Sequence, residues 1–245
     1  MQYTSLMIIG QRTLTIGQER YVYSIRRSRK AKHINVHVSV ADGIELVVPW
    51  RVAVRQAESF LHEKQAWIAE RMRLSRQLRS DVPRRQLVSG TVLPVLDQKL
   101  VLEVIVEPLR KRTTAVLRHN RLVIHVARAP QTKAVVTRWY RQQADIYFTD
   151  VTAQIALDIE RQVTRISIGH ARSQWGSCSA AGRLSFTWRL LLAPEWVARY
   201  VAVHEVAHLA HSNPSPAYWQ LVHQLYDRTQ KARAWLRRHG HELEL

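Results

Sequence analysis

The stretch YVAVHEVAHLAH, residues 200–211, carries the strongest structural signal in this sequence of 245 residues. Its apolar residues recur at helical spacing, and His204 and His208 stand four residues apart among them. On a helix this spacing places both imidazoles on one face, where they can bind one Zn²⁺ ion. Glu205 follows the first histidine and has the chemistry of a general base for metal-assisted hydrolysis. The stretch therefore predicts a metal-binding helix with two histidine ligands and Glu205 as the catalytic residue.

Helices and strands are predicted on both sides of this stretch. Ala193-Pro194 opens the metal-binding helix, because proline suits the first helical position, and residues 213–216 (NPSP) stop it after about residue 211. Two short helices are expected next, at 216–226 and 228–238. Upstream, the pattern favours a long helix at 132–161, a strand at 165–170 and an extended hairpin through Gly182 to Leu192.

The first half of the chain alternates in the manner of strands. Short β-branched runs predict strands at 21–25, 34–38, 44–48, 99–106, 114–118 and 121–127. Asp42-Gly43 and His119-Asn120 are expected to form hairpin turns. A helix is predicted over 52–79, where no glycine or proline occurs. The fold class is therefore α+β, with a basic, β-rich region with one long helix at 1–130 and a mostly helical domain at 131–245, divided at Ala129-Pro130.

The composition indicates a basic globular protein. The chain has 37 Lys and Arg residues against 19 Asp and Glu, and a net charge of +18. Residues 1–130 account for +13 of this excess and residues 131–245 for +5. Such a charge favours contact with a polyanion, although a solvated basic surface is the more ordinary interpretation and no nucleic-acid-binding motif is visible. The single cysteine, Cys178, and the lack of a signal peptide or an apolar span predict a cytoplasmic protein without a membrane partner.

Motifs on both sides of the His-Glu-x-x-His stretch complete a known pattern. Upstream lie residues 172–179 (RSQWGSCS) and 182–190 (GRLSFTWRL), and downstream lie residues 213–219 (NPSPAYW). Together with residues 63–68 (EKQAWI) and 235–241 (WLRRHGH), they resemble the YgjP/WLM-type metallopeptidase family, also called the DUF45 family. The SprT-like zincins are relatives of that family, so the resemblance implies a zincin-like catalytic domain at the C-terminal end of the chain.

The resemblance also implies roles for individual residues. His204 and His208 correspond to the first two zinc ligands of the family, and Glu205 to its catalytic glutamate. The family's third ligand is the histidine of an N-H-S-P segment, and Pro214 occupies that position here. A catalytic zinc usually has three protein ligands, so the missing histidine calls for a substitute.

Two other histidines could complete the ligand set. His211 could reach the metal if the helix ended near residue 208 and a loop carried it inward. His223, on the next predicted helix, is a second candidate, and a site with only two histidines is the remaining alternative. The predicted cofactor is Zn²⁺, and the predicted ligand set is His204, His208 and His211.

Several residues near these motifs have two interpretations. Strand 183–190 is expected along the cleft as an edge strand, where an extended peptide could pair with it. Cys178 is expected to pack in the interior rather than to react. Three aromatic side chains are expected in the core: Trp188, Tyr218 and Trp219. Three arginines either stabilise an oxyanion or face solvent: Arg172, Arg183 and Arg189.

Three functions follow from these features. The first is a zinc metallopeptidase, which would act on a peptide or protein. The second is a nucleotide pyrophosphatase of the UTP type, in which the arginines would neutralise the substrate. The third is a relative without catalysis that binds nucleic acid or protein. The resemblance favours the first, and the oligomeric state stays open.

Overall fold

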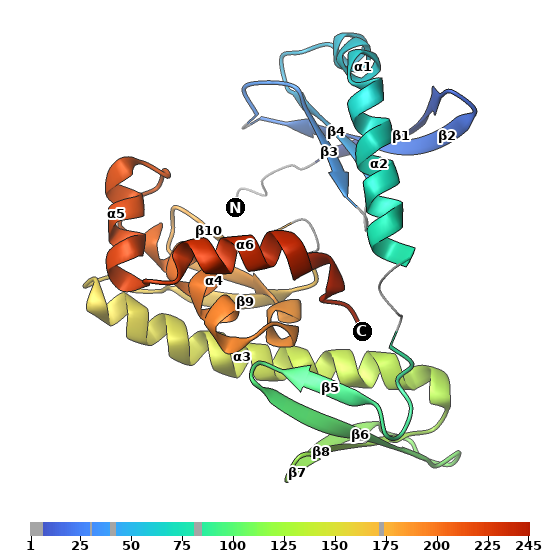
Figure 1. Cartoon of the computed structure of the whole chain (residues 1–245), viewed down its shortest axis with the longest axis vertical. Coiled ribbons are helices and arrows are strands. Elements are labelled where there is room, and N and C mark those ends of the chain that lie inside the picture. The colour runs from blue at the N-terminus through green and yellow to red at the C-terminus, as the bar shows by residue number, and fades with distance from the viewer. Residues whose placement is uncertain (1–6, 30, 40–42, 81–84, 172–173) are drawn as a thin grey trace. The chain divides into compact units, whose positions relative to one another are not determined.

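The computed structural model describes residues 7–29, 31–39, 43–80, 85–171 and 174–245, without the side chains of 7–9, 39 and 74–80. Two compact units make up the chain, Met1–Pro83 and Arg84–Leu245, which we call unit 1 and unit 2. Each unit combines a β-sheet with packed helices (Figure 1). The predicted α+β fold class is therefore confirmed.

Unit 1 begins with a four-stranded mixed sheet. Its strands follow the order β1-β2-β4-β3, with antiparallel outer pairs and a parallel central pair. The strands are β1 (Met7–Ile16), β2 (Glu19–Ser28), β3 (Asn35–Ser39) and β4 (Gly43–Pro49). The sequence predicted the last three. The first, β1, adds to the prediction and pairs with β2 across a tight turn in which Gly17 has φ +61°.

The predicted hairpin of β3 and β4 is confirmed by their antiparallel pairing, which ends at Ser39 opposite Gly43. Asp42, part of the predicted turn, lies outside the described residues. Two helices follow, α1 (Val54–Glu63) and α2 (Gln65–Ser80), where one helix was expected. Lys64 interrupts them with φ −93° and ψ 10°. No glycine or proline marks the interruption, so the local sequence does not reveal it.

The core of unit 1 joins alternate strand residues to one stripe of the helices. Side chains of β2 point inward at every second position, as a half-buried strand requires. Helix α1 packs on β4, and α2 packs on β1 and β3. The buried residues that meet there include Tyr21, Tyr23, Ile25, Leu46, Leu61 and Ile68.

Unit 2 begins with a second sheet of the same design. Its order is β5-β6-β8-β7, again with antiparallel outer pairs and a parallel central pair. The strands are β5 (Val92–Val95), β6 (Gln98–Val106), β7 (Thr114–Arg118) and β8 (Arg121–Val126). The predicted turn at His119-Asn120 is confirmed, because Arg118 pairs with Arg121 around it and His119 adopts φ +54°.

The long helix α3 (Thr132–Asp158) forms the middle layer of unit 2 (Figure 1). It contacts β7 and β8 on one side and the C-terminal elements on another. Tyr140 on this helix donates a hydrogen bond to the carbonyl oxygen of Pro94, at 2.6 Å. Phe148 stacks on Phe186 with ring centroids 4.1 Å apart. One buried core therefore extends from β5 to the C-terminal helices.

The division into units differs from the expected boundary between residues 130 and 131. The second sheet shares its core with α3, and the first sheet has a separate core. Lys133 Nζ donates a hydrogen bond to the carbonyl oxygen of Leu245, at 2.7 Å, which joins the start of α3 to the end of the chain. Ala129-Pro130 only begins a short 3₁₀ turn, η1 (Ala129–Gln131), before α3. A shared core rather than a local sequence break defines a unit, so the boundary lies near residue 83.

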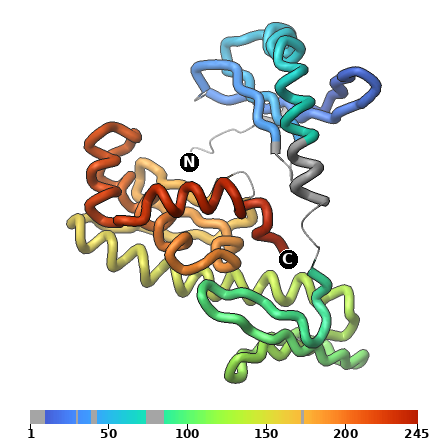
Figure 2. The backbone as a smooth tube through the Cα atoms, viewed as in Figure 1, coloured from blue at the N-terminus to red at the C-terminus, as the bar shows by residue number. Residues whose placement is uncertain are grey.

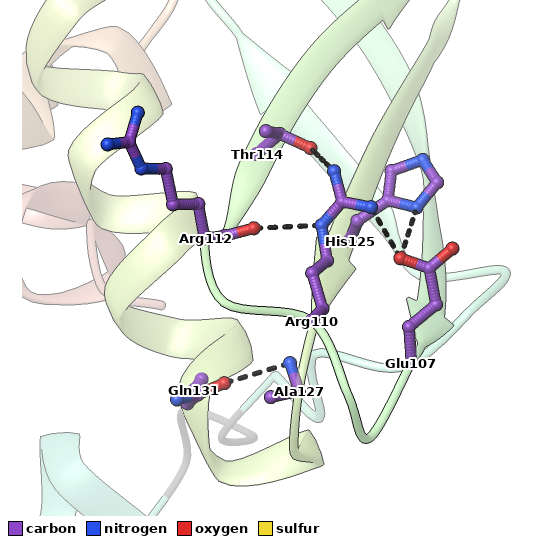
Figure 3. A network of polar contacts seen from close by, with 7 residues as sticks. All are labelled: Glu107, Arg110, Arg112, Thr114, His125, Ala127 and Gln131. Atoms are coloured by element: carbon purple, nitrogen blue, oxygen red, sulfur yellow. Dashed lines mark hydrogen bonds and ion pairs between the residues drawn. The ribbon is translucent and has the colours of Figure 1, made fainter.

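Polar contacts fasten the loops at the end of the second sheet (Figure 3). The Arg110 guanidinium donates to the Glu107 carboxylate and lowers its pKa. The same carboxylate lies 3.4 Å from Nδ1 of His125 on β8. Gln131, just before α3, accepts a hydrogen bond from the backbone N–H of Ala127 at 3.0 Å. These contacts hold the β6–β7 connection and the start of α3 against the sheet.

A small three-stranded sheet follows α3. It consists of β9 (Arg165–Gly169), β10 (Gly176–Cys178) and β11 (Arg183–Thr187), in the order β10-β11-β9. The expected edge strand at 183–190 is therefore corrected, because β11 is central and pairs with both neighbours. The strand also ends at Thr187, where the 3₁₀ turn η2 (Trp188–Leu192) begins. All five side chains of η2 are buried, which suits a turn through the core better than a two-faced strand.

Three helices complete unit 2: α4 (Glu195–Ala207), α5 (Pro216–Leu225) and α6 (Thr229–His239). A last 3₁₀ turn, η3 (Gly240–Glu242), follows them. Figure 2 traces the chain from α3 through the small sheet into these helices. In the part of the chain that the structure describes, no helix has both the length and the apolar character needed to cross a membrane.

Candidate metal centre

Helix α4 carries the two predicted histidine ligands. The ring centroids of His204 and His208 lie 5.2 Å apart, and their planes are inclined by 83°. The helix is deeply buried along most of its length, and Glu205 is only 6% exposed. The predicted pair therefore comes together on one element, because residues four apart face the same side of a helix.

A hydrogen bond at Nδ1 orients each imidazole. Nδ1 of His204 lies 2.6 Å from the hydroxyl of Tyr218, and that hydroxyl also donates to the carbonyl oxygen of His204 at 2.9 Å. Nδ1 of His208 lies 3.1 Å from the carbonyl oxygen of His211. Since a carbonyl and a hydroxyl already engaged as a donor can only accept, both Nδ1 atoms carry the proton. Each Nε2 then keeps its lone pair, the form in which histidine binds a metal.

Burial shifts the pKa values of His204 and Glu205 in opposite directions and favours the neutral form of both. Desolvation lowers the pKa of His204 to about 4, with smaller contributions from His208 and Arg233. The imidazole is therefore neutral near pH 7. Desolvation also raises the pKa of Glu205 to about 7. A carboxyl group with a pKa near the working pH suits a general base, which must both accept and release a proton.

Gly176 in β10 makes room for the Glu205 side chain. A Cβ atom at this position would lie 2.7 Å from both Cγ and Oε1 of Glu205, closer than van der Waals contact allows. Gly176 lies in strand β10, which packs against α4. This close approach explains why glycine occupies the position in the WGSC motif, because any side chain there would displace the Glu205 carboxylate.

Small-ligand sites typically have volumes of about 300–1,000 Å³, and a cavity of ≈ 530 Å³ opens beside Glu205. Its wall combines groups from β10, α4 and α6. The polar and aromatic residues that line it include Trp175, His204, Glu205, Arg233 and Arg237. The cavity therefore leaves the Glu205 carboxyl group within reach of a small molecule.

The third metal ligand depends on the chain beyond α4. The helix ends at Ala207, and His208 is its C-terminal cap, so His211 lies outside the helix, as a third ligand from this loop requires. The structure nevertheless does not bring His211 into the pair, because its carbonyl oxygen is the group that meets His208. His223 is exposed on α5, with its ring 6.4 Å from that of Trp219. Among the residues that the structure describes, no group of three or more His, Cys, Asp or Glu side chains could hold a metal ion.

Arg189, Arg183 and Cys178, from the motifs upstream of α4, differ in how deeply they are buried. Arg189 is 7% exposed and donates to the carbonyl oxygen of His170 at 3.0 Å, so it belongs to the interior. Arg183 is exposed at the start of β11, and Arg172 lies outside the described residues. Burial, with a smaller contribution from Glu205, raises the pKa of the Cys178 thiol, which favours packing over reactivity.

Two contributions to the site were missed at the level of sequence. Trp188 and Tyr218 are buried, as expected, but Tyr218 also holds His204 through its hydroxyl. The sequence signal for the position of Tyr218 was Ser215, three residues before it. Ser215 caps α5 by accepting a hydrogen bond from the Tyr218 N–H at 3.3 Å. Arg233 and Arg237 gave no signal, because nothing in the local sequence of α6 shows that this face borders the cavity.

Comparison with known proteins agrees with these observations. A family model for the YgjP-like metallopeptidase domain matches residues 32–239, which include α4 and the residues of the cavity. Searches of curated proteins and of solved structures found no match. The match spans most of the chain and includes both histidines, Glu205 and the glycine beside it. The chain belongs to the YgjP-like metallopeptidase family.

Proposed function

We propose that the chain is a zinc-dependent peptidase in which His204 and His208 bind the metal and Glu205 is the general base. The observation that carries the proposal is the state of the two imidazoles. Both have Nδ1 engaged and Nε2 available, and the buried Glu205 lies beside them at the cavity. This donor set fits two positions of a tetrahedral zinc site.

The reaction would be hydrolysis of an amide bond. Zinc, when bound, supplies Lewis-acid chemistry that polarises a carbonyl group and eases deprotonation of water. The Glu205 carboxylate accepts a proton from the attacking water molecule while the oxygen of that water bonds to the carbonyl carbon. The same group passes that proton to the amide nitrogen as the C–N bond breaks. Tyr218 keeps His204 in the tautomer that the metal requires.

Zinc content is the first measurement. Protein purified without chelators is expected to hold about one zinc ion per chain, as a catalytic site does. His204→Ala and His208→Ala should each lose it. His33, an exposed residue of unit 1, provides the matched control, and His33→Ala should keep the metal. Equal zinc content in all four proteins would exclude the assignment of the two ligands.

Hydrolysis is the second measurement. A mixed library of fluorogenic peptides should be cleaved by the wild-type protein, and Glu205→Gln should cleave it about 10²–10⁴-fold more slowly. The variant should retain its zinc, because the proposed role of Glu205 is proton transfer and not metal binding. Undiminished cleavage by Glu205→Gln would contradict the proposed general base.

The third ligand position needs its own variants. We propose His211, because it follows the end of α4 by four residues in a segment outside the helix, although its side chain would have to turn toward the pair from its position in this structure. His211→Ala should then weaken zinc binding, whereas His223→Ala should not. Pro214→His restores the family's ligand at its own position. A large gain of zinc affinity in Pro214→His, with no loss in His211→Ala, would mean that the natural site has only two protein ligands.

The nucleotide pyrophosphatase and the non-catalytic binding protein stay as alternative proposals. Release of pyrophosphate from UTP by the wild-type protein, but not by Glu205→Gln, would support the first. A cytoplasmic location stays a prediction from the single cysteine and is tested by cell fractionation.

A further inference from the structure

Two arginines of α6 border the cavity beside the catalytic carboxyl group. Arg233 and Arg237 both line it, together with His204 and Glu205. They stand four residues apart, so their side chains leave the same face of the helix one turn from each other. Both are exposed, so a ligand in the cavity can reach them.

Aromatic contacts hold this face of α6 near the metal-binding helix. The guanidinium carbon of Arg233 lies 4.8 Å from the ring centroid of Trp219. The Trp219 ring in turn lies 5.8 Å from that of His204. At the end of α6, a Cβ on Gly240 would approach Trp175 to 2.6 Å, so the helix and the tryptophan are closely apposed. These contacts limit how far Arg233 can move away from the site.

The two arginines have no ion-pair partner among the residues that the structure describes. Among the described residues, no carboxylate forms an ion pair with Arg233 or Arg237, whereas Arg189 pairs with Glu244 and Arg110 with Glu107. Of the described residues that line the cavity, Glu205 alone has a carboxyl group, and the proposed mechanism uses it for proton transfer. An anionic group on the substrate would therefore find two unpaired guanidinium groups, which bind carboxylates well.

We propose that Arg233 and Arg237 form a subsite for a carboxylate of the peptide substrate, close to the bond that is cleaved. The proposal rests on the proposed peptidase function and adds the class of substrate to it. The carboxylate is either an acidic side chain or the C-terminal carboxylate of the peptide, since both present the same chemistry to a guanidinium group.

The test compares peptides that differ only in this charge. The first set of pairs places Glu in one peptide and Gln in the other, at each position within two residues of the cleaved bond in turn. A further pair ends in a free carboxylate or in an amide. For the wild-type protein, kcat/KM should be about tenfold or more higher for the charged member of one pair, as hydrogen bonds to charged groups predict. The pair that shows the preference identifies the source of the carboxylate.

Arginine variants then assign the preference to the subsite. In Arg233→Gln and Arg237→Gln, the ratio between charged and neutral peptide should fall toward one. Arg238 is the matched control, because it is exposed on the same helix but does not line the cavity. Arg238→Gln should keep the wild-type ratio. A preference that survives in both cavity variants, or that disappears in Arg238→Gln, would overturn the proposal.

Binding separates this proposal from the peptidase function itself. Fluorescently labelled peptides of the same pairs are titrated into Glu205→Gln protein and followed by fluorescence anisotropy. If the wild-type protein cleaves no peptide, the peptidase function fails, and tighter binding of the charged peptide still tests the subsite. Equal binding and equal cleavage of charged and neutral peptides would reject the subsite. Binding of UTP alone, without any peptide preference, would also reject it and assign the arginines to a phosphate.

Discussion

The two units contain the same sheet design and use it differently. Both sheets have two antiparallel hairpins joined through a parallel central pair, and both are followed by helix. In unit 1 the helices α1 and α2 close a small core over the sheet. In unit 2 the sheet is covered by α3, which also contacts β9, η2 and α4. The candidate metal centre belongs to the elements after α3, so it is the extension of the second sheet and not its topology that provides the candidate site.

The separate cores of the two units allow the comparison to be tested by a matched pair of substitutions. Leu46 in β4 and Ile124 in β8 are both fully buried in central strands. Leu46→Ala and Ile124→Ala should each destabilise their own unit by about 2–5 kcal/mol, through lost burial and a cavity. Hydrogen exchange is expected to accelerate in unit 1 only for the first variant and in unit 2 only for the second.

Peptide hydrolysis sharpens the same test. At a temperature where both variants stay folded, Leu46→Ala should keep wild-type activity, while heating should inactivate Ile124→Ala first. If Leu46→Ala accelerated exchange throughout both units, the chain would unfold as one body, and the contrast between two independent cores would be lost.

A pair of glycines tests how closely the site depends on its neighbouring strand. Gly176→Ala should displace the Glu205 carboxylate, since its Cβ would lie 2.7 Å from Oε1, and we expect about 10²-fold slower hydrolysis with the zinc retained. Gly169 in β9 belongs to the same small sheet, and a Cβ there meets nothing closer than 3.9 Å. Gly169→Ala should therefore have little effect. Equal rates for the two variants would show that Glu205 is not confined by β10.

A pair of tyrosine hydroxyls gives the smallest expected effects. Tyr218→Phe removes the hydroxyl that holds Nδ1 of His204, and zinc affinity should fall about tenfold or somewhat more. Tyr23 in unit 1 donates to the Glu58 carboxylate at 2.7 Å, so Tyr23→Phe should cost about 1 kcal/mol of the stability of unit 1. Zinc titration and chemical denaturation of both variants measure these effects. Unchanged zinc affinity in Tyr218→Phe would remove this tyrosine from the metal centre.

Much of the fold was predictable because its signals are local. Hairpin turns, the long helix without glycine or proline, and the spacing of His204 and His208 each depend on a few adjacent residues. The errors occur where distant segments decide the outcome. Strand β11 became central because both β9 and β10 pair with it. The boundary differs from the expected one at residue 130 because α3 shares a core with the second sheet. Local periodicity carries no information on such partners.

The candidate site divides in the same way. The sequence alone predicted the helix of the candidate site, its two histidines on one side and the adjacent Glu205, since helical geometry places residues four apart on one face. Only the tertiary structure decided what surrounds them: the Tyr218 hydroxyl on His204, the space at Gly176 for Glu205, and the two arginines at the cavity. Those neighbours come from other elements of unit 2, and their placement follows from the packing of a shared core, which no local pattern of residues specifies.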